Sequence, residues 1–178
     1  LVLPNEDLPF KLFVFEGSNG NYQVSKHWHR SIEIFLVLEG SIDFYINSQR
    51  YRLSEGQFIL VNSNEVHSVD SPQPNFTLVL QIPRGLFEKD PGDADHLWFR
   101  RSCGKDARLV SLIRDMQERY VQRQPGHLFG ILSDFYQMMY LLVSDYRVPE
   151  VDEERKKQNR NLDRLSRITN YIQVNYRE

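Results

Sequence analysis

The sequence predicts an α+β protein in which an antiparallel barrel or sandwich is followed by helices. Up to residue 82, short β-rich runs alternate with polar turn clusters at regular spacing. After residue 100, apolar residues recur every three or four positions, which is the period of an amphipathic helix. With 178 residues, of which 40% are hydrophobic and 26% charged, the chain is long and apolar enough for one sizeable core. This composition excludes disorder as the main state.

The expected strands are bounded by turn residues. They cover residues 10–15, 32–38, 41–46, 50–53, 57–61 and 76–82. The intervening turns include Glu39-Gly40, Ser54-Glu55-Gly56 and Asn62-Ser63-Asn64, which are rich in residues that favour turns. Because nothing in this region resembles a βαβ unit, an antiparallel arrangement is expected.

Two helices are expected next. The first carries an apolar stripe and ends at Pro125-Gly126; the stripe consists of Leu109, Leu112, Ile113, Met116 and Tyr120. The second covers residues 128–146, and its apolar face is wide enough to require burial on two sides. Both sides pack within the monomer, or one of them forms a dimer interface. The candidate dimer residues are Leu128, Leu132, Phe135, Met139 and Leu142, and a second stripe consists of Phe129, Tyr136, Tyr140 and Val143.

The end of the chain is charged and then amphipathic. Residues 149–161 contain almost no apolar side chain and are expected to be a linker. Residues 162–178 resume helical spacing, although a single helix of this length is marginal without a partner. We therefore expect the chain to stop one helix into a second domain. Residues 155–167 carry six basic side chains and one acidic side chain, which alone indicates a solvated face rather than a nucleic-acid site.

Cysteine content and hydropathy indicate the compartment. Cys103 is the only cysteine in the sequence, which excludes a disulfide framework and suits a reducing environment. No apolar run approaches the 18 residues of a membrane span, and no signal-like segment follows Leu1. We expect a trimmed chain from a cytoplasmic protein that has no contact with a membrane.

The most informative polar residues are His27, His29, Glu33 and His67. On a strand, residues two apart face the same side, so the first two histidines point together, and Glu33 keeps their parity. His67 comes from a separate strand pair. Together these side chains form a candidate site for a divalent ion such as Zn, Mn, Fe or Ni, although no cofactor is certain.

Two other interpretations of these residues stay open. They are a polar pocket floor that hydrogen-bonds the hydroxyl groups of an effector, or histidines that are satisfied within the core. Phe35, which shares the parity of Glu33, and Tyr45, on the neighbouring hairpin, are candidates for an aromatic wall of the same effector pocket.

The spacing of these residues resembles the two cupin motifs. The first motif corresponds to Gly20, then His27-Trp28-His29, Glu33 and Gly40. In the second motif, Gly56 and His67 have the expected spacing, whereas Asn62, Asn64 and Ser71 replace the usual proline, glycine and asparagine. This resemblance implies a cupin barrel, which is a double-stranded β-helix or jelly roll.

The whole chain resembles the N-terminal sensor region of AraC/XylS-type transcription regulators. The barrel, the helix pair and the charged linker occur in the order of that family, and residues 164–176 resemble the opening helix of its DNA-binding domain. The resemblance implies four segments: an effector-binding barrel (1–100), a helical dimerisation segment (101–148), a linker (149–161) and the first helix of a truncated DNA-binding domain (162–178).

The same resemblance implies a function. The barrel would bind a small-molecule effector, with sugars among the candidates, and the helices would form a homodimer. DNA would be contacted only through the C-terminal region that carries the helix-turn-helix units. The chain would then be a sensor and not an enzyme. The alternatives are a metal-dependent cupin enzyme, either a dioxygenase or a sugar isomerase, and a dimerisation module without a ligand.

Overall fold

The computed structural model describes residues 7–17, 22–87, 97–102, 104–149 and 153–176. Gly20 and Cys103 lie outside these residues. The strands, in chain order, are β1 (Lys11–Gly17), β2 (Tyr22–His27), β3 (Ile32–Ile46), β4 (Gln49–Ser54), β5 (Phe58–Val61), β6 (His67–Ser71) and β7 (Asn75–Ile82). The helical elements are a 3₁₀ turn (Arg84–Leu86), α1 (Ala107–Gln122), α2 (His127–Leu141), a π-helical turn (Leu142–Tyr146) and α3 (Glu153–Asn175).

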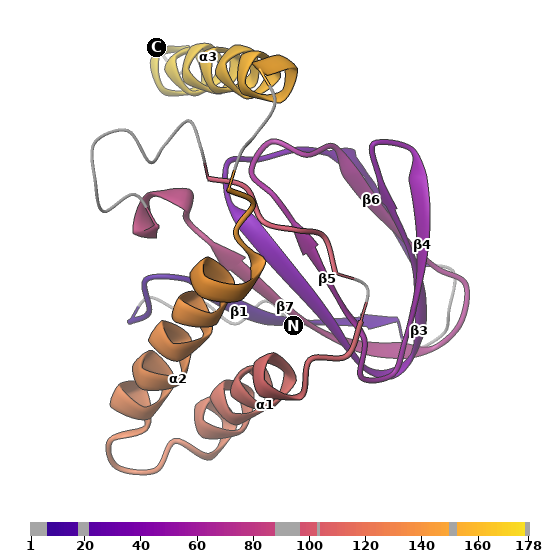
Figure 1. Cartoon of the computed structure of the whole chain (residues 1–178), viewed down its shortest axis with the longest axis vertical. Helices are drawn as coiled ribbons and strands as arrows, with labels where there is room; N and C mark the ends of the chain where they lie inside the picture. Colours follow the sequence, from indigo (N-terminus) through magenta and orange to yellow (C-terminus); the bar gives the residue numbers. More distant parts are fainter. Residues whose placement is uncertain (1–6, 18–21, 88–96, 103, 150–152, 177–178) are drawn as a thin grey trace.

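The long strand β3 holds the barrel together (Figure 1). Its first half pairs with β5 and β7, and its second half pairs with β4 and β6, always antiparallel. β1 and β2 extend the two ends of the order β1-β7-β3-β6-β2. The strands wrap around a common interior, as expected for the α+β fold with a cupin-type barrel, and this part of the prediction is confirmed.

The sequence predicted two strands, 32–38 and 41–46, where the structure has the single strand β3. The pairing with β7 shifts between Val37 and Glu39, and Gly40 follows with φ of +75°. A Cβ atom on Gly40 would lie 2.3 Å from the carbonyl oxygen of Pro74, so this position requires glycine. Glu39-Gly40 therefore bends one strand from one half of the barrel to the other instead of ending it.

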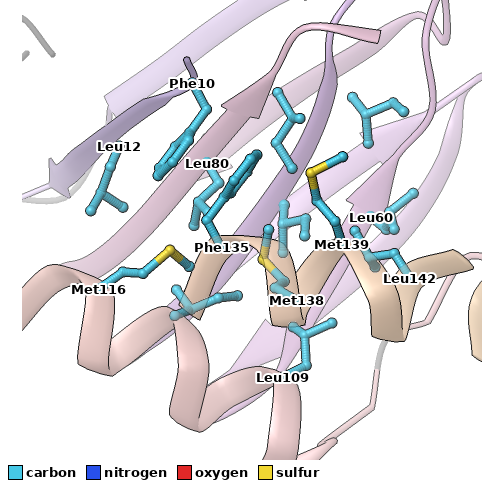
Figure 2. Packing of buried hydrophobic residues seen from close by; sticks show 14 of the residues in the cluster. Phe10, Leu12, Leu60, Leu80, Leu109, Met116, Phe135, Met138, Met139 and Leu142 are labelled. Atoms are coloured by element: carbon cyan, nitrogen blue, oxygen red, sulfur yellow. The ribbon is translucent and has the colours of Figure 1, made fainter. Parts of the chain in front are cut away.

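Alternation along β3 separates two apolar cores. Ile32, Ile34 and Leu36 face outward toward the helices, and the odd-numbered residues Phe35 and Val37 face the barrel interior. On the outer face, Phe135 of α2 stacks on Phe10 with ring centroids 4.0 Å apart, and Leu60, Leu80, Leu109 and Met116 belong to the same cluster (Figure 2). The helix pair thus covers one outer face of the barrel.

The helix pair has clear ends. Asp106 caps α1 by accepting hydrogen bonds from the backbone N–H groups of Arg108 and Leu109, and Arg123 ends it in the left-handed conformation. α2 begins after Gly126, as expected, but its regular part ends at Leu141 instead of continuing to residue 146. None of the helices in the described residues combines the length and the hydropathy needed to cross a lipid bilayer.

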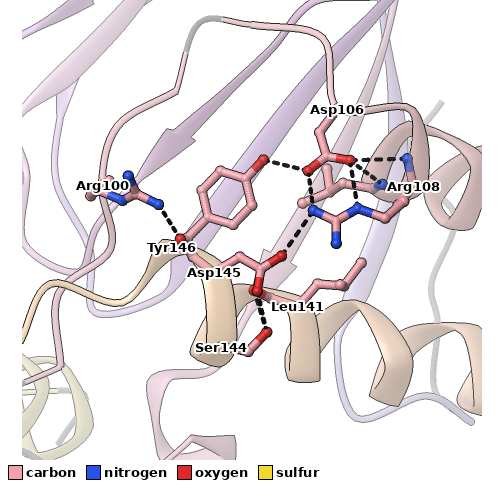
Figure 3. A network of polar contacts seen from close by, with 8 residues as sticks. Arg100, Asp106, Arg108, Leu141, Ser144, Asp145 and Tyr146 are labelled. Atoms are coloured by element: carbon pink, nitrogen blue, oxygen red, sulfur yellow. Dashed lines mark hydrogen bonds and ion pairs between the residues drawn. The ribbon is translucent and has the colours of Figure 1, made fainter.

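A polar network ties the start of α1 to the end of α2 (Figure 3). The hydroxyl group of Tyr146 donates to Asp106 at 2.9 Å, and Arg108 pairs with Asp106 at 3.0 Å and with Asp145 at 2.8 Å. The hydrogen bond from Arg108 is the main cause that lowers the pKa of Asp106. Burial, together with the hydrogen bond to Asp106, raises the pKa of Tyr146 to about 12. The network stabilises the relative position of the two helices.

α3 begins earlier than expected. It starts at Glu153, inside the segment 149–161 that was predicted to be a linker, and runs through residue 162 without a break. Glutamate, lysine, arginine and glutamine have high helix propensity, and the acidic residues Glu153 and Glu154 stand in the first turn, where they favour the helix dipole. A charged helix and a charged linker therefore have the same composition, which explains the difference. In Figure 1, α3 lies at the top of the view, and the helix pair lies at the bottom.

Candidate functional site

The predicted polar residues come together at one end of the barrel. His27 ends β2, His29 lies in the loop before β3, Glu33 is near the start of β3, and His67 begins β6. His27 and His67 are direct partners in the β2–β6 pairing, and the register shifts just before His27. The rings of these two histidines have centroids 4.2 Å apart, and the ring of His29 lies 5.1 Å from that of His67. We call these four residues the histidine cluster.

Each histidine uses Nδ1 for a backbone carbonyl. The Nδ1–O distances are 2.8 Å from His27 to Ser25, 3.2 Å from His29 to Ser31 and 2.9 Å from His67 to Glu65. Because a carbonyl oxygen only accepts, each Nδ1 carries the hydrogen. In a neutral imidazole this leaves Nε2 with a lone pair that is available to a ligand.

Glu33 lies between two of the histidines. Its Oε1 is 3.1 Å from Nε2 of His29, and its Oε2 is 3.1 Å from Nε2 of His67. Nε2 of Gln81 donates to Oε1 at 3.0 Å. The Glu33 side chain is almost completely buried. Burial would raise the pKa of this carboxyl group, but the hydrogen bonds with His29 and His67 outweigh it and lower the pKa to about 2.

Neutral histidines alone do not satisfy this arrangement. With hydrogen on Nδ1, the lone pairs of His29 Nε2 and His67 Nε2 face the carboxylate oxygens of Glu33. In this neutral state, these two nitrogen atoms and Oε2 of Glu33 have no hydrogen-bond partner among the described residues, whereas a proton on Nε2 would create the hydrogen bonds that lower the pKa of Glu33. The short contacts therefore require a proton on Nε2 or a cation between the nitrogen and oxygen atoms.

A proton on Nε2 accounts for part of the short contacts between the histidines and Glu33. Burial opposes a charge on His29, but the hydrogen bond and the charge of Glu33 outweigh it and raise the pKa of His29. The opposite holds for His27, because burial and the neighbouring imidazoles lower its pKa. One imidazolium can thus pair with Glu33, whereas protonating all three rings would place like charges side by side.

The cluster also fits a divalent cation. The ligand nitrogen atoms of His27, His29 and His67 all lie within 4.8 Å of one another. Two ligands that bind one ion at about 2.1 Å and at a right angle lie about 3.0 Å apart, which is close to the 3.1 Å contacts of Glu33. The Nδ1–carbonyl hydrogen bonds are of the kind that orients metal-binding histidines. Imidazole and carboxylate ligands suit Zn, Mn, Fe or Ni.

The two aromatic residues that were predicted for the pocket have different positions. Phe35 lies in the barrel interior and contacts Phe44 edge-on at 4.7 Å, and Phe44 is parallel to His67 at 6.0 Å. Phe35 therefore belongs to the apolar floor below the histidine cluster. Tyr45 alternates with the buried Phe44, so its side chain lies on the outer face of the barrel, in a cavity of about 460 Å³ with Lys26 and Ser68. Tyr45 also lines a cavity of about 280 Å³ together with His67 of the cluster.

The candidate dimer residues lie mostly inside the monomer. Phe135, Met139 and Leu142 are buried in the core between α2 and the barrel, and Leu128 and Leu132 are partly buried against that core. The apolar spacing of this stripe serves packing of α2 on the barrel. The second stripe of the same helix is exposed: it consists of Phe129, Tyr136, Tyr140 and Val143.

Gln81 is a cluster residue that the sequence analysis missed. It pairs with Glu33 across β7 and β3 and orients the Glu33 carboxylate. A signal was present: Gln81 has the inward parity of Val79 on a strand whose opposite face is apolar. A polar residue at such a position indicates a buried polar partner.

Comparison with known proteins agrees with this architecture. A family model described as AraC-like ligand binding domain matches residues 9–138. A curated relative, the uncharacterized HTH-type transcriptional regulator YdeC of Bacillus subtilis (strain 168), is 30% identical over 57 residues, which are 32% of this chain and 20% of the relative. The aligned segment thus spans a small part of that protein.

Solved structures with similar folds share little sequence identity with this chain. A cupin superfamily protein from Desulfitobacterium hafniense is 17% identical and covers 46% of this chain and 73% of its own, with a TM-score of 0.42. The cupin domain of Cnp3 from Schizosaccharomyces pombe is 17% identical and covers 50% of this chain and 66% of its own, with a TM-score of 0.44. Because the family model matches well over half of the residues, the chain belongs to the family of AraC-like ligand binding domains.

Proposed function

We propose that this chain senses a small-molecule effector for a transcription regulator of the AraC type, and that the histidine cluster is the part of the barrel that contacts the effector. The observation that carries the proposal is the convergence of Nε2 of His29, Nε2 of His67 and Oε2 of Glu33, which have no hydrogen-bond partner among the described residues. The ligand-binding family to which the chain belongs supports a sensor over a metal-dependent enzyme. Apolar side chains fill the barrel interior below the histidine cluster. An effector would therefore reach the cluster from the end of the barrel at which these residues lie.

A hydroxylated effector such as a sugar fits the chemistry of the cluster. A hydroxyl group both donates and accepts, so it can donate to a lone pair on Nε2 and accept from a protonated His29. Glu33 adds a buried carboxylate that accepts from a hydroxyl group, and Gln81 keeps this carboxylate in position. A small number of precisely placed polar groups of this kind gives a ligand pocket its specificity.

A divalent cation is a second occupant that the same atoms support. His27, His29, Glu33 and His67 would hold it through their Nε2 and carboxylate atoms. When bound, the cation would act as a Lewis acid that anchors an oxygen atom of the effector. The residues of the chain would still orient the effector and exclude water below the cluster.

The exposed stripe of α2 is the dimerisation surface that we propose in place of the buried one. Phe129, Tyr136, Tyr140 and Val143 follow one another at intervals of seven, four and three residues. This is the spacing of a coiled-coil seam, in which two helices cover each other's apolar side chains. α3 is proposed to be the opening helix of the DNA-binding region.

Isothermal titration with zinc tests the cluster directly. We expect Glu33→Gln to weaken zinc binding by about tenfold or more, because it removes the buried negative charge that faces His29 and His67. Glu39→Gln is the matched control, since Glu39 is an exposed carboxylate on the same strand. If Glu33→Gln and Glu39→Gln bound zinc with equal affinity, the zinc site would not include Glu33. A screen of sugars and related metabolites with the same variants then identifies hydroxylated ligands that require Glu33.

A genetic experiment tests the regulatory role. Deletion of the gene that encodes this chain, followed by RNA sequencing with and without the identified ligand, should change a small set of transcripts only when the ligand is present. A ligand that binds the chain but changes no transcript in a gene-dependent way would contradict the sensor function.

The dimer is tested by sedimentation. Tyr140→Lys should increase the monomeric fraction because it places a charge in the proposed seam. Val121→Lys changes an exposed apolar residue on α1 in the same way and serves as the control. An unchanged sedimentation coefficient in Tyr140→Lys, at concentrations where the wild-type chain is dimeric, would exclude this face.

A further inference from the structure

A cavity of about 600 Å³ lies where α3 meets the barrel. One wall consists of residues 64–66 in the turn between β5 and β6, and another consists of residues 98–101. Leu162 of α3 lines the same space, whereas the histidine cluster does not. Small-molecule pockets have volumes of roughly 300–1,000 Å³, so this space is large enough for a ligand. We call it the α3 cavity.

Hydrogen bonds hold the two walls of the α3 cavity together. The side chain of Asn62 accepts from the backbone N–H of Phe99 at 2.8 Å and donates to its carbonyl oxygen at 3.1 Å. Oε2 of Glu65 accepts from the backbone N–H of Asn62 at 2.9 Å, and Oε1 accepts from Nη2 of Arg101. Nη1 of Arg101 donates to the hydroxyl group of Tyr51 at 2.8 Å. The cavity is therefore formed before any ligand binds, as is usual for small-molecule sites.

Two polar atoms of the cavity residues lack a partner. Asn64 is only 4% exposed, and its Oδ1 has no hydrogen-bond partner among the described residues. Nδ2 of the same side chain is engaged, because it donates to Oδ1 of Asp163 at 3.2 Å. Nε of Arg101 is also buried without a partner in the described part of the chain. One acceptor and one donor thus remain, and a hydroxyl group satisfies both kinds, because its oxygen atom donates and accepts.

The other side chains of the α3 cavity favour an aromatic ring. Val66, Val148 and Leu162 line it together with Trp98. A sugar would turn several hydroxyl groups toward these apolar side chains, which is unfavourable, whereas an aromatic ring packs against them. The carboxylate of Glu65 and the guanidinium group of Arg101 stand in the same walls, so a ligand of either charge would meet a like charge. These features select a neutral ring that carries one hydroxyl group.

We propose that the α3 cavity is a second ligand site, separate from the histidine cluster, and that it binds a neutral phenol. The phenolic hydroxyl group donates to Oδ1 of Asn64 and accepts from Nε of Arg101, and the ring lies against Leu162. The site goes beyond the proposed sensor function, because it requires neither the histidine cluster nor its occupant.

Binding of the phenol stabilises the docked position of α3. Without a ligand, the polar contacts of α3 with the barrel include those of Asp163, whose Oδ1 is 3.2 Å from Nε of Arg30 and 3.2 Å from Nδ2 of Asn64. A ring between Leu162 and the barrel adds apolar burial to these contacts. A ligand that binds only the docked arrangement shifts the equilibrium toward it.

Two matched compounds test the recognition of the hydroxyl group. Methyl 4-hydroxybenzoate is a neutral phenol, and methyl 4-methoxybenzoate has the same ring and ester but no hydrogen to donate. In ligand-observed NMR titrations of the full chain, we expect the methoxy compound to bind at least about tenfold more weakly, because it leaves Oδ1 of Asn64 without a donor. Equal affinities, or no binding of the phenol at millimolar concentration, would overturn the proposal.

Variants locate the binding site. Leu162→Trp fills the α3 cavity and should weaken phenol binding about tenfold or more, whereas Leu165→Trp places the same side chain at an exposed position of α3 outside the cavity and should not. Asn64→Gly removes Oδ1 and keeps the backbone, since glycine adopts the φ of +65° found there. In Asn64→Gly, the two compounds should bind with similar affinities. Equal phenol binding by Leu162→Trp and Leu165→Trp would overturn the site.

Two further measurements separate this site from the histidine cluster. Glu33→Gln should bind the phenol as the wild type does; if binding required Glu33 but not Asn64, the α3 cavity would be excluded and the sensor function would stand. Hydrogen–deuterium exchange should show the amides of α3 protected about threefold by the phenol in the wild type and not in Leu162→Trp. Unchanged exchange of α3 in the phenol-saturated wild type would place the ring away from Leu162 and overturn the proposal.

Discussion

α2 and α3 are both amphipathic, but they are held in place by different forces. α2 places Ile131, Phe135 and Met138 in the core against the barrel, where they are fully buried. α3 leaves its apolar residues Leu165 and Ile168 exposed and contacts the barrel rim through Asp163. The same kind of sequence pattern therefore produces one helix that is part of the core and one that is docked by polar contacts.

This difference distinguishes α2, whose position is fixed by burial, from α3, whose position depends on individual polar contacts. Burial of apolar surface contributes several kcal/mol for a few large side chains, on the order of 1.5–3 kcal/mol each, and does not depend on a particular partner atom. Hydrogen bonds to charged groups contribute on the order of 1.5–3 kcal/mol and are lost when another ligand takes the same donors. In a sensor, the part that responds to a ligand is expected among the elements of low local stability, which here means α3.

The largest expected effect comes from removing the main contact of α2. Phe135→Ala should lower the free energy of unfolding by about 3–5 kcal/mol, because Phe135 is fully buried and stacks on Phe10. Gln137→Ala on the same helix is the control: Gln137 is exposed and lies outside the proposed dimer seam, so the change should stay within about 0.5 kcal/mol. Urea denaturation followed by tryptophan fluorescence measures both. Similar losses in the two variants would contradict the assignment of one buried and one exposed face.

A smaller effect is expected at the network that connects α1 and α2. Asp106→Ala removes the helix cap and the acceptor of Tyr146, and should cost about 1 kcal/mol at neutral pH. The hydrogen bond from Arg108 lowers the pKa of Asp106 in the folded state. The contribution of this carboxylate is therefore complete above the pKa of an unfolded aspartate, about 3.9, and disappears as the pH falls through the lower folded value.

Urea denaturation of the wild type and Asp106→Ala at several pH values tests this direction of the pH dependence. The difference between the two proteins should be constant above about pH 5 and should shrink below about pH 4. Asp115→Ala, on the same helix but away from its N-terminus, is the control and should show a smaller difference. A difference that grows on acidification would show that the folded state does not favour the ionised form of Asp106.

Much of the barrel was predictable because its strands are short and end at recognisable turns. The spacing of His27, His29 and Glu33 predicts that these side chains converge. Residues 32–38 are apolar nearly throughout, so their sequence alone does not separate the two faces of β3. The continuity of β3 through Gly40 was not predictable, since a glycine after an acidic residue usually ends a strand. The close approach of Pro74 that requires this glycine involves a residue 34 positions later in the chain.

The candidate site was predictable to the extent that it depends on local parity. The residue types and their spacing indicated the cluster, but the structure distributes the four residues over β2, the β2–β3 loop, β3 and β6, so parity on one strand does not account for their convergence. The parity of Tyr45 follows only from the buried positions of Phe44 and Ile46, because β3 continues through Gly40. The contacts of Asp163 with Arg30 and Asn64 join positions about a hundred residues apart, so no local pattern could predict them.

The smallest expected effect tests α3 itself. Ile168→Ser replaces an apolar residue of α3 that is 55% exposed, and the two residues have similar helix propensities. If polar contacts rather than apolar burial hold α3, the free energy of unfolding of the barrel should change by less than about 0.5 kcal/mol. Urea denaturation at two protein concentrations measures this. A loss above about 1 kcal/mol that grows with concentration would mean that a second chain covers Ile168, and α3 would then be held by burial, as α2 is.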